Sequence, residues 1–253
     1  MARRSKQSPA APCLSPRHRS CAVTSNTIRE DLEQAFNDLR AMDASLDEQL
    51  GALSQAVRHK WPDFAEAINR LVARLRRNGV GASSPRIGEA MPPFHLPDEH
   101  GRIVSLDQLL ANGPLAVMFH RGHWCSYCRI SINSLARAQA EIGKEQIVLI
   151  MPERQRFLSD LKSAGQVPFP ILTDLDNAYA LSLNLVFWLD VEMQAMMRVR
   201  HLDLPSFQGN DSWMLPVPAT FVVGRDGLIK ARFIDPDYRK RMAIGDLIAA
   251  LRE

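Results

Sequence analysis

The first part of the chain has the apolar spacing of amphipathic helices, with apolar residues recurring every three or four positions. A first helix is expected to start at Thr27, which is followed by Glu30 in the spacing of a capping box. A second helix, or a broken pair, covers Leu46 to His59, and Pro62 opens a third. We therefore expect a helical extension over residues 26–80, followed by a linker rich in Gly and Ser.

After Pro85 the pattern alternates between strands and helices. Two continuous apolar runs are typical of strands buried on both faces: Leu115–Phe119 and Ile147–Met151. A further strand is expected over Val167–Leu172. Helices are expected to begin at or just after Cys125, in the turn that contains Pro152, and at Asp176. A β-hairpin turning at Asp226–Gly227 and an amphipathic helix close the chain. The pattern predicts an α/β domain over residues 85–253, with a central mixed sheet flanked by helices.

One segment, Val186 to Val217, fits this alternation poorly. It is rich in Met and Trp, which are more typical of core filling, although flexible Met-rich surfaces also bind partners. The sequence leaves both interpretations open.

Composition narrows the class of protein. The 253 residues are 46% apolar and 23% charged, with a net charge of +3, as in ordinary globular proteins. We expect no nucleic-acid binding and no membrane span, because neither a basic aromatic surface nor an apolar run of about 20 residues is present. Residues 1–25 contain no acid and no apolar core, so we expect a disordered tail in which Cys13 and Cys21 have no role. The expected location is cytoplasmic.

The pair Cys125 and Cys128 carries the clearest chemical signal. A structural zinc site normally needs four ligands from two separated pairs, and no second pair follows, so we expect no metal. A secreted disulfide scaffold would need more cysteines in a shorter chain. A redox dithiol remains: a helix start at Cys125 would lower the pKa of its thiol, and Cys128 would lie one turn away. Arg121 could support that thiolate or form a surface salt bridge. His120 and His123 are more often structural or solvated than catalytic.

Several segments resemble known families. "MFHRGHWCSYCRISINSL" resembles the W-C-x-x-C active site of thioredoxin-fold proteins, and "LPVPATFVVGRDGLI" resembles their segment with a cis-proline facing the dithiol, here Pro218. "IGEAMPPFHLPDEHGRIVSLDQLL" and "VPFPILTDLDNAYALSLNL" resemble the alkyl hydroperoxide reductase/thiol-specific antioxidant family, the peroxiredoxins. "DPDYRKR" is similar to a peroxiredoxin-like subgroup with a W-C-x-Y-C site.

The resemblance implies a thioredoxin-like fold and an antioxidant thiol oxidoreductase. It would need no cofactor, because the Cys125–Cys128 disulfide is the redox centre, and its reductant would be an external thiol from a thioredoxin or glutathione system. Trp124, Arg121, Tyr127 and Pro218 would line the site. The helical extension could form a homodimer, or it could cover one face of the main domain.

The sequence departs from the peroxiredoxin motif P-x-x-x-T-x-x-C in both possible registers. With Cys128 in the peroxidatic position, Cys125 replaces the Thr; with Cys125 there, Gly122 replaces it. We expect Cys125 to attack and Cys128 to resolve, but the registers leave this open. The substrate can be a hydroperoxide or, in the alternative, a protein disulfide. A non-enzymatic redox sensor or interaction module is a further alternative.

Overall fold

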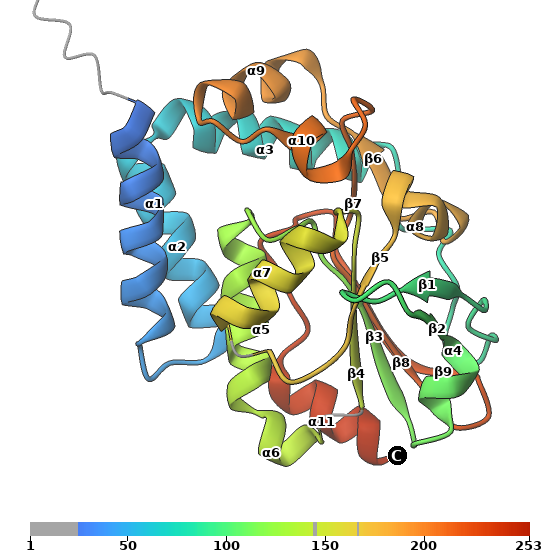
Figure 1. The fold of residues 1–253 in the computed structure, drawn as a ribbon. Helices are drawn as coiled ribbons and strands as arrows, with labels where there is room; N and C mark the ends of the chain where they lie inside the picture. The colour runs from blue at the N-terminus through green and yellow to red at the C-terminus, as the bar shows by residue number, and fades with distance from the viewer. Residues whose placement is uncertain (1–24, 144–145, 166) are drawn as a thin grey trace, which may run out of the picture.

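The structure is a computed structural model that describes residues 25–143, 146–165 and 167–253 (Figure 1). Its centre is a five-stranded sheet in the order β5 (Ile171–Thr173), β4 (Ile147–Met151), β3 (Leu115–Phe119), β8 (Ala219–Val223) and β9 (Ile229–Ile234). The strands β3, β4 and β5 are parallel, and β8 and β9 continue the sheet as an antiparallel hairpin. This mixed sheet confirms the predicted α/β class and the predicted hairpin.

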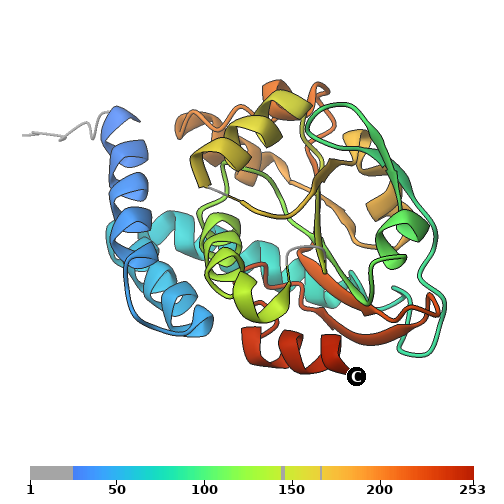
Figure 2. The same ribbon diagram turned by 60° about the horizontal axis from the view of Figure 1, so that its bottom comes forward.

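Both faces of the sheet are covered, which explains why its central strands are apolar throughout. Alternate residues of a strand point to opposite faces. Leu115, Val117 and Phe119 pack on one face against the hairpin β1 (His95–Pro97) and β2 (Ile103–Ser105), with α4 (Leu106–Leu110) and α8 (Ala178–Ser182). Ala116 and Met118 pack on the other face against α5 (Ser126–Arg137), α6 (Gln139–Ile142), α7 (Gln155–Gly165) and α11 (Ile244–Arg252), and Figure 2 shows α11 along this side.

The helical extension consists of α1 (Ser25–Arg40), α2 (Leu46–Lys60) and α3 (Pro62–Arg77). It wraps around the domain on the side of α5 (Figure 1). Leu53 of α2 and Ile68 of α3 belong to the same buried cluster as both cysteines of the dithiol. The extension therefore covers one face of the domain, and a homodimer stays a prediction.

The segment rich in Met and Trp forms an insertion beside α3. It contains β6 (Val186–Trp188), α9 (Val191–Val199), α10 (Leu204–Gln208) and β7 (Met214–Pro216), and β6 pairs with β7 in a separate two-stranded sheet. Met193, Met197 and Trp213 are buried in the cluster that contains the dithiol, whereas Trp188 is 47% exposed. The side chains thus serve both as core and as surface.

Several predicted boundaries differ from the structure for local reasons. The strand predicted from Val167 is shortened to β5, because Pro168 and Pro170 lack the N–H that a ladder needs. The helix predicted at Asp176 is a short 3-10 turn, Leu175–Asn177, followed by α8, since Asp176 is left-handed at φ 63°.

Three helix starts or ends also shift. The helix predicted to have Pro152 in its first turn, α7, starts only at Gln155, and the helix after Cys125 ends at Arg137, before α6. Thr27 lies inside α1, which starts at Ser25. The predicted tail lies outside the described residues, apart from Ser25. None of the helices that the structure describes is long and apolar enough to cross a membrane.

Candidate active site

The two cysteines lie where β3 is followed by α5. The backbone N–H of Cys125 donates to the carbonyl of Gly122 at 3.2 Å, and its own carbonyl accepts from Arg129 N–H at 2.9 Å. Cys125 is thus the residue that caps α5, which confirms the predicted helix start, and Cys128 lies in the first turn. Both are free thiols, 2% and 0% exposed, and the Cys128 thiol is hydrogen-bonded to the Cys125 sulfur. Both sulfurs therefore lie at the start of the same helix.

Two buried guanidinium groups face these sulfurs. The side chain of Arg121 is hydrogen-bonded to Cys125, and its backbone N–H donates to Cys128 Sγ at 3.5 Å. Arg241, from the loop before α11, donates through Nη2 to Cys128 Sγ at 3.5 Å. Within the described ranges, no carboxylate forms an ion pair with either arginine. Because a buried cation is costly without a counter-charge, a thiolate is the anion that this site favours.

Aromatic rings hold the first guanidinium in place. Arg121 lies 3.6 Å from the ring centroid of Tyr238 and 4.9 Å from that of Trp124. Tyr127 packs edge-on against Tyr238 at 5.6 Å, and its hydroxyl lies 3.2 Å from the Ser54 hydroxyl of α2. The structure thus places Trp124, Arg121 and Tyr127 together near the dithiol, and their role as residues that line the site stays a prediction.

The two thiols are driven to different protonation states. Burial opposes ionisation of Cys125 and is the largest effect on it. The Cys128 thiol, the charges of Arg121 and Arg241 and the Cys128 N–H together outweigh burial and hold the pKa of Cys125 well below its usual range. Burial, together with the bond and the negative charge at Cys125, raises the pKa of Cys128 well above its usual range. The arrangement therefore favours one thiolate, at Cys125, beside one neutral thiol.

Pro218 lies at the same end of the sheet as the dithiol loop. It directly precedes Ala219, which pairs with Phe119 at the last position of β3. The predicted cis bond is wrong, because every peptide bond in the described residues is trans. The chain runs here from β7 into β8 without a tight turn, with Val217 N–H donating to Leu185, so the trans form that prolines generally prefer is accommodated.

The two histidines of the loop have different surroundings. His120 is 1% exposed, and its Nε2 lies 3.5 Å from the Ser131 hydroxyl. Burial, with a contribution from the charge of Arg241, lowers the pKa of His120 to about 3, so it is a neutral core residue. His123 instead donates from its backbone N–H and from Nδ1 to the carboxylate of Glu153, at 2.7 and 2.8 Å.

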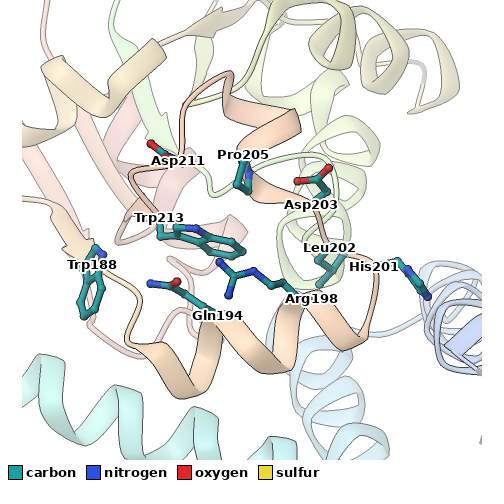
Figure 3. Close-up of a pocket in the computed structure, with 9 residues that line it drawn as sticks. All are labelled: Trp188, Gln194, Arg198, His201, Leu202, Asp203, Pro205, Asp211 and Trp213. Carbon is teal, nitrogen blue, oxygen red and sulfur yellow. The ribbon is translucent and has the colours of Figure 1, made fainter.

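Two cavities adjoin this region. A groove of about 980 Å³ is lined by His123, Trp124 and Ser126, the residues that flank Cys125 in the chain. Phe157 of α7 and Phe207 of α10 form part of its wall. A pocket of about 720 Å³ in the insertion is lined by Trp188, Gln194, Arg198, His201, Leu202, Asp203, Pro205, Asp211 and Trp213 (Figure 3). The two cavities share His201, Leu202 and Asp203, so the insertion forms one wall of the groove.

Three side chains of this site were not predicted from the sequence. Arg241 and Tyr238 belong to "DPDYRKR", which carried a resemblance but no assigned role. Their position more than 100 residues from the cysteines in sequence gave no local signal. Glu153 did carry one: an acid two residues after a fully buried strand is unusual enough to suggest a site.

Comparison with known proteins identifies a family and similar folds. A family model described as "AhpC/TSA family" matches residues 87–232. No curated protein matches the chain. Three solved structures are similar over 66% of this chain, each with a TM-score of 0.50. The peroxidoxin BcpB from Mycobacterium tuberculosis is 17% identical to this chain, and the match covers 96% of the BcpB chain.

The other two structures show the same level of likeness. A cysteine-to-serine variant of peroxiredoxin 6 from Arenicola marina is 16% identical and 72% covered. The reduced 2-Cys peroxiredoxin of Plasmodium vivax is 12% identical and 81% covered. At these identities the likeness concerns the fold.

Proposed function

Because the chain belongs to the AhpC/TSA family, and is a thiol-dependent oxidoreductase of that family, we propose that its Cys125–Cys128 dithiol reduces hydroperoxides. The observation that carries this proposal is the buried thiolate site. Cys125 is the N-cap residue of α5 and accepts a hydrogen bond from Cys128, and the charges of Arg121 and Arg241 lower the pKa of its thiol. A thiolate is the nucleophile that the reaction needs.

The reaction proceeds in three balanced steps. The Cys125 thiolate attacks the terminal oxygen of the hydroperoxide, the O–O bond breaks, and an alcohol leaves after taking up one proton. Cys128 then attacks the resulting sulfenic acid, which forms the disulfide and releases water. Two external thiols return the disulfide to a thiolate and a thiol. A thioredoxin or glutathione system would supply them, in a reducing compartment such as the cytoplasm.

The depth of the nucleophile favours a hydroperoxide over a protein disulfide. Cys125 is 2% exposed, and Trp124 and Ser126 rather than Cys125 line the groove beside it. A small peroxide can approach such a sulfur more readily than the bulky disulfide of a folded protein. Protein disulfide reduction is therefore the second candidate.

The test measures both activities in the same samples. We expect the wild-type protein to consume tert-butyl hydroperoxide with dithiothreitol as reductant, and to leave the disulfides of insulin largely intact. Cys125→Ser should lose the peroxidase activity. Cys128→Ser should still form a sulfenic acid that dimedone traps. Sulfenic acid in Cys125→Ser alone would reverse the two roles, and insulin reduction without peroxide consumption would replace the proposal with the second candidate.

A further inference from the structure

Glu153 is a buried carboxylate that the steps above do not use. It follows β4 and is 0% exposed, and its backbone carbonyl accepts a bond from the Thr173 hydroxyl at the end of β5. Both of its carboxylate oxygens accept from one residue, His123. Isolated carboxylates are seldom buried, because desolvation of their charge is costly. The hydrogen bonds with His123 are therefore the interactions that stabilise this buried carboxylate.

The carboxylate lies in the electrostatic range of the reactive sulfur. Burial raises the pKa of Glu153, the bonds and charge of His123 oppose that rise, and the negative charge of Cys125 adds to it. The backbone is shaped around this group: a Cβ on Gly122 would lie 2.6 Å from Glu153 Oε1 and 2.6 Å from Trp124 Nε1. The loop that precedes Cys125 thus packs closely against the Glu153 carboxylate.

The imidazole of His123 is held from three sides. Its Nδ1 donates to Glu153, and its ring stacks on Phe157 at 4.8 Å with an interplanar angle of 7°. Phe207 packs edge-on against the ring, also at 4.8 Å. The side chain remains 27% exposed and lines the groove together with Trp124 and Ser126. Since Nδ1 is committed to Glu153, Nε2 on the opposite edge of the ring is the nitrogen available to a molecule in the groove.

We propose that His123 is a catalytic residue that moves the proton in the peroxide-reducing step, with Glu153 as the positioning residue that orients it; this rests on the proposed function. As the Cys125 thiolate attacks the terminal oxygen, Nε2 accepts the proton of that O–H group. The O–O bond breaks and its electron pair goes to the alkoxide oxygen. Nε2 then returns the proton to this oxygen, so the alcohol leaves and a sulfenate remains on Cys125. A proton from solvent converts the sulfenate into the sulfenic acid that Cys128 attacks. The sulfur loses two electrons and the peroxide gains them.

This role predicts an effect that depends on the leaving group. An alkoxide must be protonated to leave, whereas a carboxylate leaves as an anion, so a peracid does not need the proton transfer. Alkylation by iodoacetamide releases iodide and needs none either. A residue that merely supported the loop would affect all three reactions alike.

The experiment compares these three reagents on reduced protein. His123→Asn keeps a donor at the position of Nδ1 and removes Nε2. We expect it to slow the reaction with tert-butyl hydroperoxide about 100-fold, with peracetic acid less than about threefold, and with iodoacetamide less than about twofold. Glu153→Gln should give the same pattern with a loss of about tenfold for the hydroperoxide. His100→Gln changes a histidine whose side chain is 63% exposed and does not line the groove, and it should match the wild type with all three.

The outcomes separate the inference from the proposed function. Equal losses with all three reagents in His123→Asn, or an unchanged rate with tert-butyl hydroperoxide, would overturn the role of His123. A wild-type protein that reacts with iodoacetamide but with neither peroxide would remove the proposed function, and the inference with it.

Discussion

Arg241 Nη2 lies 3.5 Å from Cys128 Sγ, although the two residues are 113 positions apart in the chain. Arg241 is 7% exposed, and its Nη1 donates hydrogen bonds to the carbonyls of Tyr238 and Lys240. It is therefore fixed beside the dithiol by its own loop. Its charge acts to lower the pKa of both thiols, against the effect of burial. The lowering effects prevail at Cys125, whereas the pKa of Cys128 remains raised.

Replacement of Arg241 by Met should make Cys125 a weaker nucleophile at neutral pH. With this charge removed, burial is opposed only by Arg121 and by Cys128, so the pKa of Cys125 rises. We expect alkylation by iodoacetamide at pH 7 to slow roughly tenfold. Lys240→Met removes a charge from the same loop at an exposed side chain, and should change the rate less than about twofold. An unchanged rate in Arg241→Met would show that this charge does not tune the sulfur.

Gly122 should not tolerate a side chain. Its φ of +143° is unfavourable for other residues, and the added Cβ would meet the bonded carboxylate of Glu153. We expect Gly122→Ala to lower the free energy of unfolding by about 2–3 kcal/mol, measured by urea denaturation. Gly51→Ala is the matched control: Gly51 lies in α2 with no atom within 4 Å of the new Cβ, so a gain of about 0.5–1 kcal/mol is expected. Equal effects at the two glycines would contradict the close fit at Gly122.

The helical extension should be part of the same cooperative unit as the dithiol. Leu53 of α2 is 1% exposed and belongs to the cluster that contains Cys125 and Cys128. We expect Leu53→Ala to lower the free energy of unfolding by about 3 kcal/mol in a single transition. Arg58→Ala, at an exposed position of the same helix, should change it by less than about 0.5 kcal/mol. Two separate transitions would instead show that the extension unfolds by itself.

His120 should make the protein sensitive to acid. Its pKa is about 3 in the folded protein and about 6.5 when unfolded, so the unfolded chain binds the proton more readily. Its contribution to stability is fully present above pH 6.5 and is lost as the pH falls towards 3. Between pH 7.5 and 4.5, we expect the wild type to lose about 3 kcal/mol more stability than His120→Gln in urea denaturation. Parallel pH profiles would contradict a lowered pKa of His120 in the folded protein.

The sequence predicted those parts of the fold that depend on local pattern. The apolar runs of β3 and β4 identified the central strands, and the position of Cys125 between a strand and an amphipathic stretch located the helix start. Boundaries failed where single residues decide them, as at Pro168, Pro170 and Asp176. These residues act through one missing N–H or one left-handed φ, which periodicity does not register.

The site was predictable only near the cysteines. Trp124, Arg121 and Tyr127 are close to the dithiol in sequence, so a local motif includes them. Arg241 and Glu153 reach it through tertiary packing, from a loop after β9 and from the end of β4. No spacing in one sequence connects such distant positions.

The segment that the family model matches, residues 87–232, contains both cysteines but ends before Arg241 and begins after α3. A fragment trimmed to those borders would keep both cysteines. It would lose the charge of Arg241 and the apolar side chains of Leu53 and Ile68, which pack in the same cluster as the cysteines. In such a fragment the sulfurs of Cys125 and Cys128 would contact water, and the pKa values of both thiols would return toward those of ordinary cysteines. The reactivity that we propose for Cys125 thus depends on α2, α3 and the loop of Arg241, which lie outside the matched segment, as well as on the segment itself.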